Sequence, residues 1–84
     1  HGVKIGDNVI FDPAVGMDVN ASVSSHCYIS SGVVLSGGCV IQKNVALGAG
    51  VIVDNRVKIG KNQKIAAGTI ISESLEGLYR KESA

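Results

Sequence analysis

The residues of this 84-residue sequence best suited to chemistry are two histidines and two lysines. An imidazole that titrates near neutrality can remove a proton from a hydroxyl or an amine, and His1 and His26 are the candidates for that role. Lys43 and Lys61 could bind a phosphate-rich ligand if the fold brings them together. The use of these residues therefore depends on the elements that position them.

A six-residue period runs through the chain and predicts those elements. A large apolar residue occupies each of twelve positions, namely Ile5, Phe11, Met17, Val23, Ile29, Leu35, Ile41, Leu47, Val53, Ile59, Ile65 and Ile71. Six is a multiple of the two-residue period of a strand but not of the 3.6-residue period of a helix. We expect an all-β fold, a hexapeptide β-helix of about four triangular coils, with this residue and the one four positions later pointing inward.

Residues that lie 18 positions apart should stack, because three six-residue units close one triangular coil. The three stacked columns are Asn8, His26, Asn44 and Asn62; Ala14, Gly32, Gly50 and Gly68; and Asn20, Gly38, Arg56 and Ser74. Glycine and asparagine tolerate left-handed backbone best, so each column suits one corner of the prism. His26 replaces asparagine in an otherwise uniform column, and we expect it to contact Asn44. Lys43 and Lys61 should stack beside that column.

Composition limits the classes of function. One domain fits the length, and the net charge of +1 gives no broad field to attract nucleic acid. No apolar run is long enough to cross a membrane, and no signal peptide is present. Cys27 and Cys39 both occupy inward positions, where we expect buried free thiols and hence a reducing, cytoplasmic setting.

The pattern also predicts the domain boundaries. Residues 1–75 are expected to form the β-helix and residues 76–84 a tail or short helix, from which Leu78 and Tyr79, with Leu75, could cover the last coil. The sequence starts at His1 in mid-pattern, which would leave the first coil with an unpaired edge that solenoids normally cap. We therefore expect a fragment of a longer chain.

Three stretches carry a resemblance to a known family. "IGDNV", "LGAGVIV" and "IGKNQKIAAGTII" resemble the hexapeptide-repeat acyltransferase superfamily, and the closest likeness is to its sialic-acid and sugar O-acetyltransferase-like branch. The resemblance implies a left-handed β-helix, a homotrimer, acetyl-CoA as acyl donor in a groove between neighbouring prisms, and a histidine that deprotonates the acceptor. In "HGVKIGDNV" that histidine would be His1, whereas before "ISSGVVLSGG" it would be His26.

The candidate site follows from these points, each with a structural alternative. The catalytic candidates are His26 and His1, which could instead be a corner residue and a frayed end. The candidates for binding acetyl-CoA are Lys43, Ala49, Gly50, Lys61, Ala67 and Gly68. The lysines could equally form a solvated face and the small residues simple turns, although "GAG" and "AAG" would leave room for pantetheine. Two histidines are too few for a three-histidine zinc site, so no metal is expected.

Three functions remain open from the sequence. The first is an acyl-CoA-dependent O- or N-acetyltransferase domain that acts on a sugar or similar small acceptor. The second is a non-catalytic assembly or regulatory β-helix, such as the C-terminal part of a sugar nucleotidyltransferase, and the third is a purely structural solenoid. No loop leaves the coils between residues 5 and 75, and a bare prism offers few converging side chains for catalysis.

Overall fold

Twelve two-residue strands follow one another at six-residue intervals in the computed structural model, which describes residues 2–74. The strands are β1 (Lys4–Ile5), β2 (Ile10–Phe11), β3 (Gly16–Met17), β4 (Ser22–Val23), β5 (Tyr28–Ile29), β6 (Val34–Leu35), β7 (Val40–Ile41), β8 (Ala46–Leu47), β9 (Ile52–Val53), β10 (Lys58–Ile59), β11 (Lys64–Ile65) and β12 (Ile70–Ile71). No helix occurs within residues 2–74.

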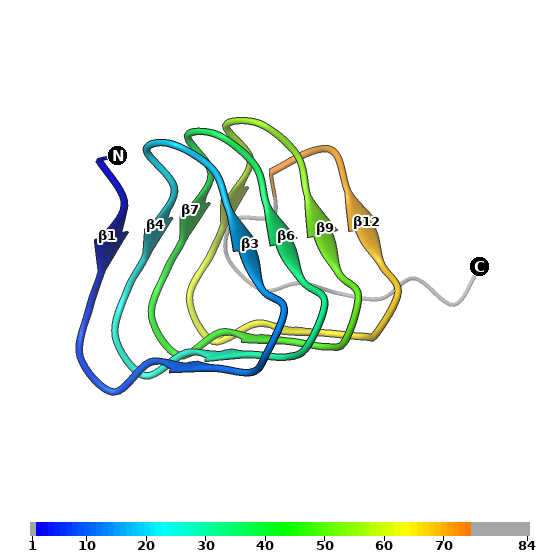
Figure 1. Cartoon of the computed structure of the whole chain (residues 1–84), viewed down its shortest axis with the longest axis horizontal. Coiled ribbons are helices and arrows are strands. Elements are labelled where there is room, and N and C mark those ends of the chain that lie inside the picture. The colour runs from blue at the N-terminus through cyan, green and yellow to red at the C-terminus, as the bar shows by residue number, and fades with distance from the viewer. Residues whose placement is uncertain (1, 75–84) are drawn as a thin grey trace.

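The strands form three parallel four-stranded sheets, which are the three faces of a prism (Figure 1). The first face has the order β1-β4-β7-β10, the second β2-β5-β8-β11 and the third β3-β6-β9-β12. Every strand pairs with the strand 18 residues later, as in Lys4 with Ser22 and Ala46 with Lys64. The predicted β-solenoid of about four turns is therefore confirmed, and its strand order is compatible with the left-handed β-helix. We number its coils as residues 3–20, 21–38, 39–56 and 57–74.

The corners have the left-handed backbone that the columns predict. Positive φ values recur at every sixth residue, at Gly2, Asn8, Ala14, Asn20, His26, Gly32, Gly38, Asn44, Gly50, Arg56, Asn62 and Gly68. Asparagine and glycine adopt this conformation at little cost, whereas His26 (φ 62°) and Arg56 (φ 61°) hold it with larger side chains. The first corner contains the column of Asn8, the second that of Ala14 and the third that of Asn20.

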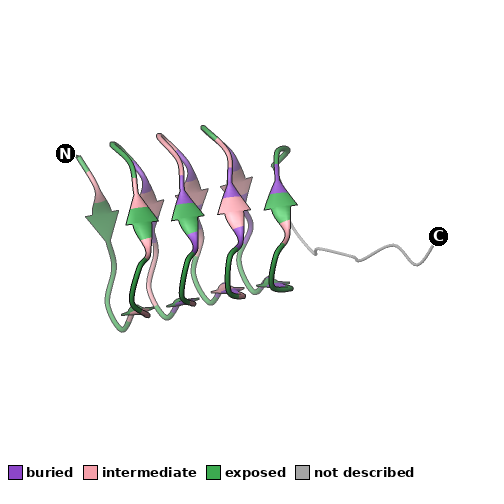
Figure 2. Cartoon of the chain, turned by 45° about the vertical axis from the view of Figure 1, so that its right-hand side comes forward, coloured by how far each residue is buried: buried purple, intermediate pink, exposed green. Residues whose placement is uncertain are grey.

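The core is a continuous apolar column inside the prism. Its fully buried members include Ile29, Leu35, Ile41 and Leu47, and they begin in the second coil. The residues four positions further on are also buried, Cys27 and Cys39 among them, so both predicted inward series are confirmed there. The first coil differs, because its inward side chains are exposed or only half-buried (Figure 2).

Candidate functional site

His26 lies at the first corner, between β4 on the first face and β5 on the second, and its side chain is exposed. The expected contact with Asn44 is not formed. Asn44 instead donates its Nδ2 hydrogen to Oδ1 of Asn62 at 2.9 Å, as one step of a ladder along the corner. The Nδ1 atom of His26 lies 3.5 Å from Nδ2 of Asn8, one coil earlier, so Asn8 is the residue that orients the imidazole.

The orientation of the Asn8 amide determines which imidazole nitrogen can accept a proton. If Asn8 donates through Nδ2, Nδ1 of His26 is the acceptor and the outer Nε2 carries the hydrogen. If the amide is rotated so that Oδ1 faces the ring, Nδ1 carries the hydrogen and Nε2 becomes a free proton acceptor. The rotated arrangement is therefore the one in which His26 can act as a general base through its exposed nitrogen.

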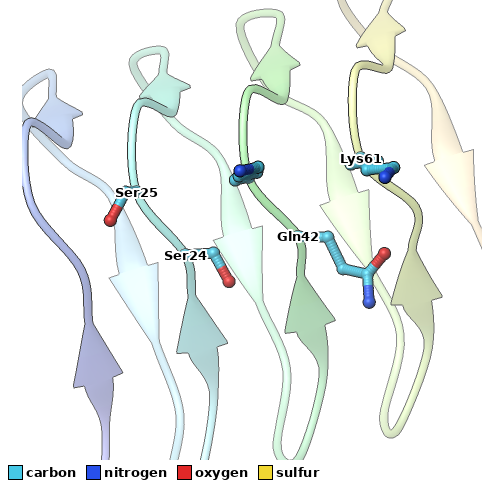
Figure 3. A pocket seen from close by; sticks show the side chains of 5 residues that line it. Ser24, Ser25, Gln42 and Lys61 are labelled. Atoms are coloured by element: carbon cyan, nitrogen blue, oxygen red, sulfur yellow. The ribbon is translucent and has the colours of Figure 1, made fainter.

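A polar cavity of about 400 Å³ lies beside this corner. It is lined by Ser24, Ser25, Gln42, Lys43 and Lys61, which come from three successive coils (Figure 3). Ser25 directly precedes His26, and Ser25, Lys43 and Lys61 are separated by steps of 18 residues, so one edge of the cavity runs along the first corner. The fold thus brings His26, Lys43 and Lys61 to the same corner.

Hydroxyl and amide groups complete the cavity and were not identified from the sequence. The Oγ atom of Ser25 accepts the Asp7 backbone N–H at 3.0 Å, which leaves its own hydrogen available as a donor. Ser24 and Gln42 stack on the first face, because Val23 pairs with Ile41 in the same register. The signal for them was the same step of 18 that relates the two lysines. The site can bind an anion through ammonium, hydroxyl and amide donors.

The small residues predicted for cofactor binding lie at another corner. Ala49, Gly50, Ala67 and Gly68 form the second corner, on the far side of the second face from the two lysines. An added Cβ at Gly50 or Gly68 would meet nothing within 4 Å, so this corner is open outward. The two parts of the predicted acetyl-CoA site are therefore not adjacent within one chain, and a ligand would have to cross the second face to reach both.

A second cavity, of about 540 Å³, lies at the third corner and was not predicted. It is lined by Asp18, Val19, Asn20, Gly37, Gly38, Asn55 and Arg56. The Oδ1 atom of Asp18 already accepts the Val19 backbone N–H at 2.7 Å. The sequence signal for this cavity was Arg56 in a column of otherwise short residues.

The remaining candidates have no partner in a metal or nucleophile site. His1 lies outside the described residues. Within residues 2–74 no group of three or more His, Cys, Asp or Glu side chains could hold a metal ion. Cys27 and Cys39 are free and buried, as predicted, and burial raises the pKa of both thiols, that of Cys39 to about 11. Neither thiol is therefore a ready nucleophile at neutral pH.

Comparison with known proteins gives no relative. No protein-family model, no curated protein and no solved structure matches this chain. Among the residues that the structure describes, no helix is long and apolar enough to cross a membrane.

Proposed function

We propose that this domain is an acyl-CoA-dependent acetyltransferase domain that modifies a hydroxyl or an amine of a sugar or similar small acceptor. The observation that carries the proposal is the placement of His26, Lys43 and Lys61 at one corner, beside a polar cavity of about 400 Å³. A proton acceptor and a phosphate-binding group are the two things that this reaction requires of the protein, because the thioester is already activated. The resemblance of the repeat to hexapeptide acyltransferases supports the same reading.

The acyl donor fits the residues in two parts. Lys43 and Lys61 would attract the phosphate groups of CoA, with Ser24, Ser25 and Gln42 as additional donors. The open corner at Gly50 and Gly68 would accommodate the narrow pantetheine arm. Since these two corners are separated in one chain, we propose that three copies assemble side by side, so that a corner of one prism faces the neighbouring prism and the groove between them completes the site.

The proposed reaction uses His26 as the general base. Its Nε2 removes the proton from the acceptor hydroxyl or amine as the acceptor oxygen or nitrogen attacks the thioester carbonyl carbon. The C–S bond then breaks, the thiolate of CoA leaves and takes up a proton, and the acetyl group remains on the acceptor. Asn8 is a positioning residue in this scheme, since its Oδ1 must accept from Nδ1 of His26 to leave Nε2 free.

The first test compares thiol release by the unaltered protein and His26→Asn, with a thermal melt of both. Asparagine is the residue that other coils have at this corner, so the fold should persist, whereas removal of a general base lowers the rate by about 10²–10⁴-fold. Binding of acetyl-CoA should persist in His26→Asn and weaken in Lys43→Gln with Lys61→Gln. An unchanged rate in His26→Asn would exclude this residue as the base.

A second variant tests the positioning role of Asn8. Asp at position 8 would accept from Nδ1 of His26 with certainty and should raise the pKa of the imidazole, because a neighbouring carboxylate favours its charged form. We expect Asn8→Asp to retain activity and to move the basic midpoint of the pH–rate profile upward. A structural role alone would leave the profile in place.

The second candidate is a non-catalytic assembly or regulatory domain. It is favoured by the regularity of the coils, because residues 4–71 contain two-residue strands at constant spacing with no loop that leaves the prism. Absence of any acetyl-CoA binding by the unaltered protein, measured by calorimetry, would replace the enzyme proposal with this one. The buried free thiols support a cytoplasmic setting for either function.

A further inference from the structure

One end of the prism has an open core. β1, β2 and β3 are the edge strands of their sheets, and all three lie at the end where the described chain begins (Figure 1). The inward side chain of β1, Ile5, is 50% exposed, whereas its counterparts one, two and three coils later are at most 1% exposed. Phe11 and Met17, the inward residues of β2 and β3, are only half-buried.

The opposite end is different. β10, β11 and β12 are also edge strands, but their inward residues Ile59, Ile65 and Ile71 are at most 4% exposed. The apolar surface at the open end is extended by Ile10 and Val19, the outward residues of the first coil that are 58% and 50% exposed. Apolar surface of this kind is stabilised by a partner that removes it from water.

The backbone of the first coil is also available for pairing. Lys4 and Gly6 donate their N–H groups to carbonyls of the second coil, at 3.1 and 2.8 Å. Successive residues of a strand direct their backbone groups to opposite sides, so the N–H and C=O of Ile5 point to the outer edge. The six-residue repeat puts Phe11 and Met17 in the same position on the other two faces. The open end therefore presents three short strand edges around three apolar side chains.

We propose that the open ends of two copies of this chain dock on each other about a two-fold axis. An axis perpendicular to the prism reverses the strand direction, so the three edges would pair as antiparallel strands. If the axis passes through the middle of the first face, Ile5 lies opposite the partner subunit's Ile5. The step of six residues then places Phe11 opposite the partner subunit's Met17, and inward positions face inward positions at all three sites.

This contact is self-complementary and closes on itself. Thioether and aromatic side chains pack well together, so the pairing of phenylalanine with methionine is favourable. Because the same surface serves both copies and the core of the far end is already buried, the assembly stops at two prisms and does not continue as a filament. The contact does not use the sides of the prism, so it goes beyond the proposed side-by-side trimer and is compatible with it, giving six chains.

The test is the mass in solution by light scattering, from low to high micromolar concentration. We expect an even number of chains, which is two if the sides do not associate and six if they do. Ile5→Asp should halve that number, since it places a carboxylate opposite its own copy. Ile70→Asp is the matched control, because Ile70 is similarly exposed but lies on β12 at the far end, and it should not halve the mass.

Two further outcomes decide the proposal. One chain or three chains at every concentration would overturn it and leave the edge to a strand of a different protein, and so would an unaltered mass in Ile5→Asp. If Ile5→Asp does not fold, hydrogen exchange of the unaltered protein replaces it. Protection of the amides of Ile5, Phe11 and Met17 that is lost on dilution supports the dimer, and exchange at unprotected rates at all concentrations refutes it. A trimer without doubling would leave the acetyltransferase proposal intact.

Discussion

The first and third coils have the same architecture but different environments. Both coils carry a large inward residue on each face, Ile5, Phe11 and Met17 in the first and Ile41, Leu47 and Val53 in the third. The third-coil residues are fully buried between two neighbouring coils, whereas the first-coil residues have a neighbour on one side only. Burial in this fold is therefore a property of the neighbouring coils and not of the residue itself.

The first coil has a different set of polar contacts. Four side-chain contacts connect it to the second coil: Ser25 Oγ accepts from the Asp7 N–H, Asn8 contacts His26, the Tyr28 hydroxyl donates to Asp12 at 2.7 Å, and the Ser31 hydroxyl donates to the Pro13 carbonyl at 2.9 Å. Between the second and third coils, the corresponding contact among the described residues is that of the Cys27 thiol with the Gln42 carbonyl. Hydrogen bonds thus hold the coil that apolar burial holds least.

The largest expected effect separates the two coils by a buried charge. Leu47→Asp would place a carboxylate among apolar residues with no partner, at a cost of several kcal/mol, which is of the order of the whole stability of a small domain. We expect this variant to be unfolded by circular dichroism. Ile5→Asp should keep a cooperative melt, because Ile5 reaches solvent. Equal losses in both variants would refute the difference in environment.

A smaller effect should come from adding one methyl group at equivalent glycines. A Cβ at Gly48 would lie 2.5 Å from the Ala67 backbone nitrogen, and a Cβ at Gly6 would lie 2.7 Å from that of Ser25. The third coil is held on both sides, so Gly48→Ala should cost about 1–3 kcal/mol of the free energy of unfolding. The first coil can shift outward, and Gly6→Ala should cost less. Urea titrations of both variants test the order, which the reverse ranking would contradict.

The thiols of the inner coils give a pH dependence. Burial raises the pKa of Cys39 to about 11 from an ordinary value of 9.0, so the folded state favours the neutral thiol. The contribution of this group to stability is complete below pH 9 and is lost as the pH rises through about 11. The midpoint of urea unfolding should fall over that interval, and Cys39→Ala should reduce the fall. A midpoint in Cys39→Ala that falls as steeply as in the unaltered protein would assign the effect to other groups.

The smallest effect concerns a contact between the first two coils. The hydrogen bond to Asp12, and then its charge, raise the pKa of the Tyr28 phenol. Asp12→Asn removes the charge, so the pKa of Tyr28 should fall toward its ordinary value with little change in stability. Ultraviolet titration follows this shift, and Asp54→Asn, on the third face, is the control that should leave it in place. An unchanged phenol titration would show that the contact does not persist in solution.

The fold was predictable because one rule is repeated twelve times. A spacing of six, with glycine or asparagine at each corner, determines the strand positions, the sheet order and the inward series. The partner of His26 was not predictable, since both stacking neighbours are asparagines, Asn8 and Asn44, and only side-chain torsions decide between them. The cavity beside Lys43 and Lys61 was missed for the same reason, because its shape depends on how long side chains are oriented.

The constant step of 18 residues between paired strands also restricts how this protein can change its length. Insertion of a single residue would turn every later inward residue outward unless the extra residue leaves the prism at a corner. Gain or loss of a whole coil keeps each column in phase and adds or removes one layer of core. The permitted lengths of the domain are therefore discrete, and a gene that encodes it can lengthen or shorten most easily by duplicating or deleting a 54-nucleotide unit.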